Sequence, residues 1–270
     1  MAVVPPPSRR RKRRMDQVMG LVNIPIDWLE ERSGLIGGLK YFLFRKVPSD
    51  INWFHTLGSA TLTAFLVQAG TGVILAMYYS PHPDEAYESI RYITHDVTLG
   101  WLVRGMHRWG ASVFIILIFL HMARVFLFGA YKYPRELNWI VGVMLLPLAM
   151  LEGFTGYLLP WDQTAYWATV VGINLNGTGP IVGPFLSQFL RSGDEIGADT
   201  LTRFYALHML LLPGAIMGLI GLHLYLVMRL GVSSPPWSED AAGKERTEAP
   251  PSGERGLVRP RARGGRPRGE

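Results

Sequence analysis

Long apolar segments alternate with shorter polar ones through the middle of the chain, and four of them are long enough to cross a membrane. They cover residues 53–79, 101–129, 138–159 and 200–230. About 20 helical residues, rising about 1.5 Å each, cross a hydrocarbon layer of about 30 Å. Aromatic residues at both ends of the first segment are typical of membrane interfaces. The pattern predicts an all-α membrane protein, a bundle of four transmembrane helices.

The segments outside these spans are charged or interrupted by glycine and proline. Residues 1–14 form a basic tail that we predict to be disordered, and residues 15–48 mix aromatic with charged side chains, which predicts an amphipathic helical segment in the interface. Residues 160–198 predict short surface helices between the third and fourth spans. Residues 233–270 are rich in Pro, Gly, Arg and Glu and predict a disordered tail. The membrane domain is therefore expected over residues 49–232.

The distribution of charge predicts how the bundle is oriented. The net charge is +6, and the basic residues gather in the two tails and in residues 130–137, whereas residues 80–100 and 192–199 are acidic. The positive-inside rule places both termini and residues 130–137 on the cytoplasmic side. The basic tails are interpreted as topology signals, so the expected partner is the lipid membrane and not a nucleic acid.

Two of the predicted spans carry two histidines each. His107 and His121 are fourteen residues apart in the second span, and His208 and His223 are fifteen apart in the fourth. Each interval is about four helical turns, or roughly 21–22 Å. Ionisable side chains are rare at membrane depth and indicate function. Because both spans run inward, His107 is expected to face His208 near the outer side, and His121 to face His223 near the cytoplasm.

Two imidazoles at each level are the axial ligands of a six-coordinate haem. A zinc ion needs all its ligands within one small sphere, which the separation of the two levels excludes. The chain has no cysteine, which excludes disulfides, thiolate metal sites and covalent CxxCH attachment. Haems with both axial positions filled transfer electrons and do not bind oxygen. We therefore predict two non-covalent haem b groups, with His107 and His208 on the outer iron and His121 and His223 on the inner iron.

Glycines and arginines accompany the histidines. The glycines of the first and third spans repeat the fourteen-residue interval, and small residues let a neighbouring group approach a membrane helix closely. Arginine pairs with carboxylates, so haem propionates are the predicted partners of the nearby arginines. The alternatives are ordinary helix packing for the glycines and interfacial snorkelling for the arginines. The predicted cofactor-binding residues are Gly58, Gly72, Arg104, Arg108, Arg124, Gly142 and Gly156.

The stretch GYLLPWDQTAYW follows the third span directly. It places Trp161, Gln163, Tyr166 and Trp167 at a membrane surface, near the level of the outer histidines. Polar and aromatic groups together suit a lipophilic ring substrate such as a quinol. An aromatic belt at the interface has a similar composition, so the composition alone leaves both interpretations open.

The chain resembles the cytochrome b family, specifically the N-terminal, cytochrome b6-type half of a split cytochrome b. The fifteen-residue histidine interval in the fourth span is the b6-type spacing. Six stretches carry the resemblance: FLVQAGTG (65–72), GWLVRGMHRWGAS (100–112), LHMARVF (120–126), PRELNWIVG (134–142), GYLLPWDQTAYWA (156–168) and TLTRFYALH (200–208).

The resemblance implies a subunit of a bacterial bc- or b6f-type complex in the plasma membrane. The expected activity is that of a quinol:cytochrome c (or plastocyanin-like acceptor) oxidoreductase, active only within the complex. Quinol would be oxidised outside and quinone reduced inside, with transmembrane electron transfer coupled to proton translocation. Trp161, Gln163, Tyr166 and Trp167 would form a wall of the quinol-oxidation site, and Arg229 would lie near the inner quinone. The outer haem would be the one of low potential.

The same resemblance implies the partners. They are a Rieske iron–sulfur protein, a separate C-terminal cytochrome b half that carries the PEWY motif, and a c-type cytochrome, in a dimeric complex with menaquinone as the expected quinone. Thr56 stands where oxygenic b6 proteins have the cysteine that attaches a c-type haem, so covalent haem c is excluded and a third, non-covalent haem near Thr56 is left open. The rival interpretations are a di-haem b-type anchor of another quinone-linked dehydrogenase or reductase, and a non-redox membrane transporter.

Overall fold

The computed structural model describes residues 25–44 and 51–238, with the side chains of residue 39 and of residues 41–43 excepted. The chain divides into two compact units, Met1–Val47 and Pro48–Glu270, each of which is described by itself. The predicted basic tail, 1–14, and most of the predicted C-terminal tail lie outside the described residues, so both stay predictions.

In the first unit, residues 25–33 and α2 (Leu35–Leu43) are helical. Gly34 joins them with a φ of 61°, a backbone conformation that favours glycine. The carboxylate of Glu30 accepts hydrogen bonds from the N–H groups of Ile36 and Gly37, at 2.7 and 3.0 Å. These bonds satisfy donors that the first turn of α2 would leave unpaired. Trp28 is exposed, and the predicted location of this segment in the membrane interface stays a prediction.

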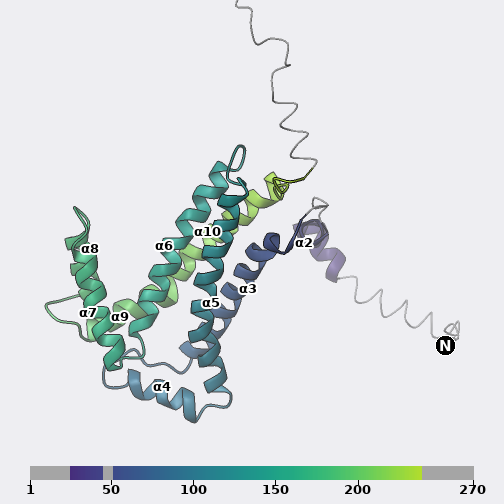
Figure 1. Cartoon of the computed structure of the whole chain (residues 1–270). Helices are drawn as coiled ribbons and strands as arrows, with labels where there is room; N and C mark the ends of the chain where they lie inside the picture. The colour runs from purple at the N-terminus through teal and green to yellow at the C-terminus, as the bar shows by residue number, and fades with distance from the viewer. Residues whose placement is uncertain (1–24, 45–50, 239–270) are drawn as a thin grey trace, which may run out of the picture. The chain divides into compact units, whose positions relative to one another are not determined.

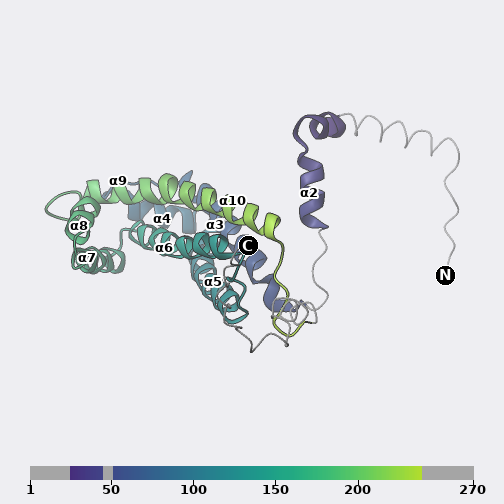
Figure 2. The same cartoon turned by 90° about the horizontal axis from the view of Figure 1, so that it is seen from above.

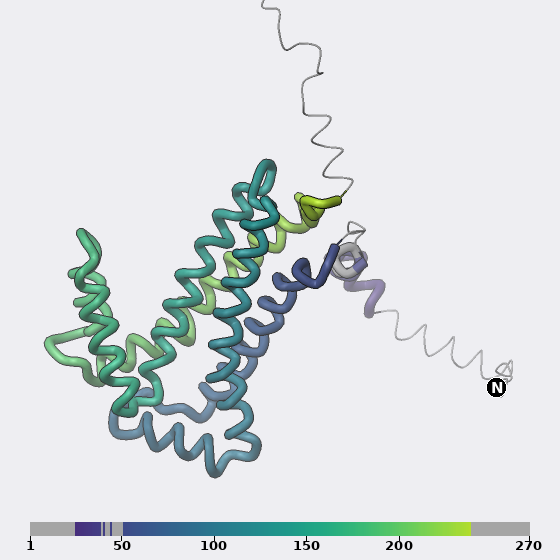
Figure 3. Tube along the Cα trace, viewed as in Figure 1, coloured from purple at the N-terminus to yellow at the C-terminus, as the bar shows by residue number. Residues whose placement is uncertain are grey.

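Within the described residues of the second unit, four helices are long and apolar enough to span a membrane, which confirms the predicted architecture (Figure 1). α3 (Leu57–Ala76), extended at its start by a short 3-10 turn, packs along α5 (Gly100–Leu127). α6 (Glu136–Leu158) packs along α10 (Leu212–Leu230), as Figure 2 also shows. Figure 3 follows the trace and shows that α5 and α10 run in the same direction, opposite to α3 and α6. Parallel α5 and α10 are what the pairing of the histidines requires.

Short helices gather at one end of this bundle. α7 (Gln163–Gly177), α8 (Gly183–Arg191) and α9 (Ala198–Ala206) follow α6, and α9 leads into α10. Asp162 caps α7, since its carboxylate accepts a hydrogen bond from the N–H of Ala165 at 2.8 Å. The predicted surface helices between the third and fourth spans are therefore present. The sequence analysis did not predict α4 (Ala86–His95), an amphipathic helix between α3 and α5.

In the part of the second unit that the structure describes, two apolar clusters pack the helices together. One is formed where α4, α6, α7, α8 and α9 meet and contains the fully buried side chains of Leu158, Ile173 and Phe204. The other lies in the middle of the bundle and brings side chains of α3, α5, α6 and α10 together: Phe65, Phe114, Ile118, Ala149 and Ile216. Phe65 lies seven residues from both Gly58 and Gly72. The second cluster therefore separates two levels of the bundle with apolar side chains.

A π-helical turn, Leu207–Leu211, joins α9 to α10 and contains His208. A π-helical turn takes in one residue more than an α-helical turn. The fifteen-residue interval between His208 and His223 therefore covers nearly the same rotation as the fourteen-residue interval on α5. This insertion explains why unequal intervals in the sequence produce matched levels in the bundle.

Candidate functional site

The four membrane histidines meet in two pairs, one on each side of the central apolar cluster. The ring centres of His107 and His208 are 6.2 Å apart, and those of His121 and His223 are 6.4 Å apart. The ring planes cross at 83° in both pairs. We call His107 and His208 the first histidine site and His121 and His223 the second. This is the pairing that the charge asymmetry and the parallel helices predict.

The spacing of the rings fits one metal ion between each pair. With metal–nitrogen bonds of about 2 Å on each side, an ion midway between two imidazoles places their centres roughly 6 Å apart. Among the described residues, no group of three or more His, Asp or Glu side chains is placed to hold a bare metal ion. A site with two protein ligands suits an iron whose other four ligands come from a porphyrin ring. The donor set therefore fits haem.

Each histidine ring faces a glycine of the neighbouring helix. A Cβ atom on Gly72 would lie 3.2 Å from Cε1 of His107, and one on Gly58 would lie 3.1 Å from Cε1 of His121. A Cβ atom on Gly142 would lie 3.4 Å from Cε1 of His223, whereas one on Gly156 would collide with the His208 ring. The predicted glycines thus sit at the two histidine levels. A Cβ atom would press on the facing ring at Gly58, Gly72 and Gly156 and would make an ordinary contact at Gly142.

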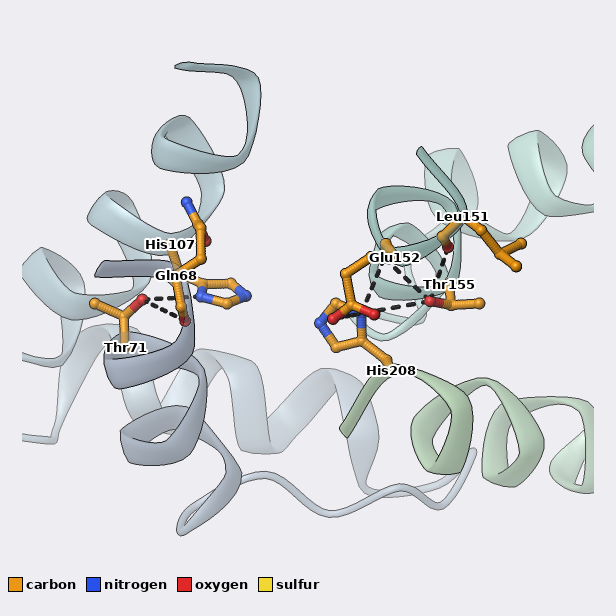
Figure 4. A network of polar contacts seen from close by, with 7 residues as sticks. All are labelled: Gln68, Thr71, His107, Leu151, Glu152, Thr155 and His208. Carbon is orange, nitrogen blue, oxygen red and sulfur yellow. Dashed lines mark hydrogen bonds and ion pairs between the residues drawn. The ribbon is translucent and has the colours of Figure 1, made fainter. Parts of the chain in front are cut away.

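Hydrogen bonds at the first site hold both rings in one orientation (Figure 4). Thr71 Oγ1 donates to the carbonyl of Val67 at 2.6 Å and therefore accepts from Nδ1–H of His107 at 2.9 Å. A ring that carries its proton on Nδ1 presents Nε2 as the metal-binding nitrogen. Figure 4 shows the rings of His107 and His208 pointing toward one another from opposite sides.

His208 has three oxygen atoms near its Nδ1. They are the main-chain carbonyl of Glu152 at 3.0 Å, the carboxylate of Glu152 at 3.2 Å and Oγ1 of Thr155 at 3.4 Å. Thr155 Oγ1 donates to the carbonyl of Leu151, so it too can only accept from the ring. The sequence analysis did not single out Thr71, Glu152 or Thr155. Glu152, a charged residue inside an apolar span, was the available signal.

The second site lacks these polar neighbours. Nδ1 of His121 and Nδ1 of His223 are buried and have no hydrogen-bond partner in the described part of the chain. The main-chain carbonyl of Asn138 faces His223, but it does not reach hydrogen-bond geometry. The residues that precede the glycines at this level, Leu57 and Val141, are apolar, whereas threonines precede them at the first site. The two sites therefore share ring geometry and differ in the groups that surround it.

The predicted arginines are near the ends of the spans. Arg104 donates to Oγ1 of Thr94 at 3.1 Å, and the charge of Arg108 lies close to it. Arg124 lies over the ring of Phe128, 5.5 Å from its centre, and its buried Nε has no partner in the described residues. Arg229 donates to the hydroxyl of Tyr225 at 3.1 Å. Their predicted roles toward propionates and quinone stay predictions.

The aromatic stretch after α6 forms a compact group at the end of the bundle nearest the first site. The rings of Trp161 and Tyr166 are 6.0 Å apart and those of Tyr166 and Trp167 are 5.2 Å apart, both edge to face. Trp167 Nε1 donates to the side chain of Gln163 at 3.0 Å, and Trp167 is exposed. Trp161 has a φ of 52°, an uncommon conformation for a bulky residue. The structure therefore brings all four predicted quinol-site residues together.

Two polar contacts outside the spans tie the ends of the bundle together. The hydroxyl of Tyr79 donates to the carbonyl of Leu159 at 2.7 Å, and burial, followed by the nearby Tyr205, raises the pKa of Tyr79 well above its usual value. At the opposite end Arg135 donates to the carbonyl of Leu230 at 3.2 Å, capping the last turn of α10, and burial lowers the pKa of its guanidinium. Both contacts join helices that carry histidines or their facing glycines.

Comparisons with known proteins agree with this geometry. The family model described as Cytochrome b/b6/petB matches residues 43–231. The cytochrome b6 of Heliobacterium modesticaldum (strain ATCC 51547 / Ice1) is 43% identical over 212 residues, which cover 78% of this chain and 100% of that protein. The cytochrome b6 of Synechococcus sp. (strain CC9311) is 40% identical over 209 residues, covering 77% and 96%.

A solved structure, described as a hyperthermophilic respiratory Complex III, superposes with a TM-score of 0.71 at 32% identity. The match covers 78% of this chain and 56% of that one, so the present chain spans about half the length of that structural relative. The family model covers well over half of the chain, and the relatives are matched over almost their whole length. The chain belongs to the cytochrome b/b6 family.

Proposed function

We propose that this chain holds two b-type haems, one at each histidine site, and forms the electron-conducting half of a quinol:cytochrome c oxidoreductase. Membership of the family makes it an integral membrane protein with b-type haem and a cytochrome b subunit of a bc- or b6f-type quinol oxidoreductase. The single observation that supports two haems is the repetition of one arrangement, two facing imidazoles with a facing glycine each, at two levels.

The residues of the two sites would bind and orient the cofactors. His107 and His208 would hold the outer haem, and His121 and His223 the inner haem. Gly58, Gly72, Gly142 and Gly156 would leave room beside the rings, most of all at Gly156, where a Cβ atom would collide with the ring of His208. When bound, the haems would supply one-electron transfer between the two faces of the membrane. The cluster between the sites places buried apolar side chains in the space separating them.

The aromatic group after α6 would form one wall of the quinol-oxidation site. Its rings lie at the same end of the bundle as the first site, and Trp167 is exposed for contact with a lipophilic ring. Asp162 and Gln163 are exposed polar groups beside these rings. Aromatic faces with a few polar groups are typical of sites for apolar ring ligands. Arg229 and Arg124, at the opposite end, would lie on the side of the inner quinone and of the inner propionates.

The complex that surrounds this chain is also part of the proposal. Both termini would be cytoplasmic in a bacterial plasma membrane, following the positive-inside rule. A Rieske protein, a separate C-terminal cytochrome b half and a c-type cytochrome would complete the complex, which would be a dimer that uses menaquinol. The resemblance supports this part of the proposal, and so does the coverage of the curated cytochrome b6 relatives, which are matched almost from end to end.

The test is a count of haems in the purified complex. The expected result is two b haems per chain, measured by reduced-minus-oxidised absorption spectra and haem extraction. His208→Leu and His223→Leu should each remove one haem and leave the other, because each replaces one ligand of one site. His95→Leu, at an exposed position of α4, is the matched control and should retain both haems. One haem in the native complex, or two in His208→Leu, would contradict the proposal.

A further inference from the structure

Glu152 is an acidic residue inside a membrane span, at the level of the first histidine site. It lies in α6, and 21% of its side chain is exposed, against 12% for that of His208. A carboxylate at this depth costs free energy unless a partner compensates for it. Its Oε1 lies 3.2 Å from Nδ1 of His208, and its Oε2 is buried without a partner in the described residues. Within the described residues, the carboxyl of Glu152 therefore contacts the ring of His208.

The second site has no equivalent carboxylate. Gly142 and Gly156 are fourteen residues apart on α6, and the residue fourteen positions before Glu152 is Asn138. Asn138 is an amide whose Oδ1 is buried and unpartnered among the described residues, and Nδ1 of His223 has no acceptor there. One helix therefore presents a carboxylate to His208, whereas no side-chain acceptor among the described residues reaches His223.

Glu152 is also the nearest acceptor at its own site. The oxygens around Nδ1 of His208 assign the ring proton to that nitrogen. The main-chain and side-chain oxygens of Glu152, at 3.0 and 3.2 Å, are closer to it than Thr155 at 3.4 Å. The main-chain oxygen stays in any variant, so a substitution removes only the side-chain contribution. A carboxyl group offers an acceptor oxygen whether or not it is ionised.

We propose that Glu152 is a positioning residue for His208, which fixes the orientation of the ring and lowers the reduction potential of the haem at the first site relative to the second. The inference rests on the proposed function, because it takes His208 to be an axial ligand. An acceptor on the far nitrogen of a ligating imidazole fixes its tautomer and increases its basicity. A more basic ligand favours the oxidised metal, which lowers the potential.

The experiment is a redox titration of the b haems in the whole complex, at one fixed pH, with the low-spin haem EPR signals recorded alongside. Glu152→Leu removes the side-chain acceptor, leaves the main-chain acceptor in place and keeps apolar volume. It should raise the reduction equilibrium constant of the first-site haem about tenfold, which is about 59 mV for one electron. Its EPR signal should shift because the ring has lost one of the groups that orient it. Glu152→Gln keeps an acceptor oxygen and should give a smaller rise in the same direction.

Asn138→Leu is the matched control at the second site and should leave the first-site haem unchanged. His208→Leu assigns the signals, since it should remove those of the first site. A Glu152→Leu complex that keeps both haems with native potentials and EPR signals would overturn the inference and leave the proposed function standing. If Glu152→Leu loses the haem, Glu152→Gln decides, and a rise of less than about twofold overturns the inference. Two haems in His208→Leu would instead overturn the proposed function.

Discussion

The two histidine sites are alike in their rings and different in what surrounds the rings. Their ring centres are 6.2 and 6.4 Å apart, and their planes cross at the same angle of 83°. At the first site Thr71 and Glu152 give each imidazole an acceptor for its Nδ1 proton. At the second site both Nδ1 atoms lack a partner among the described residues. Similar coordination geometry therefore lies in two different electrostatic environments.

The difference matters because electron transfer across a membrane needs direction. Two equal sites would share an electron equally, whereas a site whose ligands are made more basic holds the electron less tightly. An electron that enters beside the aromatic group after α6 would then move toward the second site. In the proposed function, the repeat in the fold would provide two haem sites, and the side chains that differ between them would provide the difference in reduction potential.

The largest effect is expected from adding a side chain at a glycine that faces a histidine ring. Gly156→Ala should displace the His208 ring, because the added Cβ would collide with it, at a cost of about 1–3 kcal/mol. Gly142→Ala places its Cβ 3.4 Å from the His223 ring, an ordinary contact, and should be nearly neutral. Haem content per chain measures both. Equal haem loss in the two variants would contradict the predicted difference between the two glycine positions.

A second prediction concerns the end of the bundle that carries the aromatic group. Trp161→Ala removes a ring that packs on Tyr166 and should lower kcat/KM for quinol about tenfold, since small displacements of a binding wall are costly. Both haem spectra should remain native. Trp109→Ala, an exposed aromatic residue on α5, is the control and should retain activity. Loss of a haem in Trp161→Ala would show that the residue acts through the first site instead.

A third prediction exchanges the polar neighbours of the two sites. Thr71→Val removes the acceptor of His107 and should raise the potential of the first-site haem, by the equivalent of about 0.5–1.5 kcal/mol for one neutral hydrogen bond. Leu57→Thr introduces a hydroxyl at the matching position before Gly58 and should lower the potential of the second-site haem. Redox titration should show a smaller difference between the two haem potentials in both variants. A larger difference in potential in either variant would contradict the role given to these hydrogen-bond acceptors.

The smallest effect is expected at the ties between helices. Tyr79→Phe loses the bond to Leu159 and should destabilise the bundle by about 1 kcal/mol. The raised pKa of Tyr79 means that the folded chain keeps this hydroxyl protonated at a pH where the unfolded chain ionises it. Its contribution is therefore present below pH about 10 and is lost as the pH rises further. Thermal unfolding, followed by haem absorbance, should lose part of its alkaline sensitivity in Tyr79→Phe.

Much of this arrangement could be predicted from the sequence, because the signals involved are strong and local. Long apolar runs predicted the four spans, and matched intervals predicted the levels of the histidines and glycines. The helix α4 was missed because a short amphipathic helix in a polar connection leaves little signal in composition. The π-helical turn at His208 was missed because it depends on packing and has no sequence signature of its own.

The sequence analysis also missed the polar residues around the rings of the first site, for a different reason. Thr71 and Thr155 are ordinary residues of apolar helices, and only tertiary contact brings them to the rings. Glu152 could have been found, since an acidic residue within a span is a functional candidate by default. Its contact with His208 could not have been predicted, because His208 lies fifty-six residues away in the sequence.

The most direct test of the central claim is a redox titration of the native complex and of its two ligand variants. The account predicts two one-electron steps of equal amplitude at different potentials. His208→Leu should remove the step of lower potential, and His223→Leu the step of higher potential. A single step in the native complex, or loss of the higher step in His208→Leu, would contradict the claim that the two sites hold haems whose environments set the direction of electron transfer.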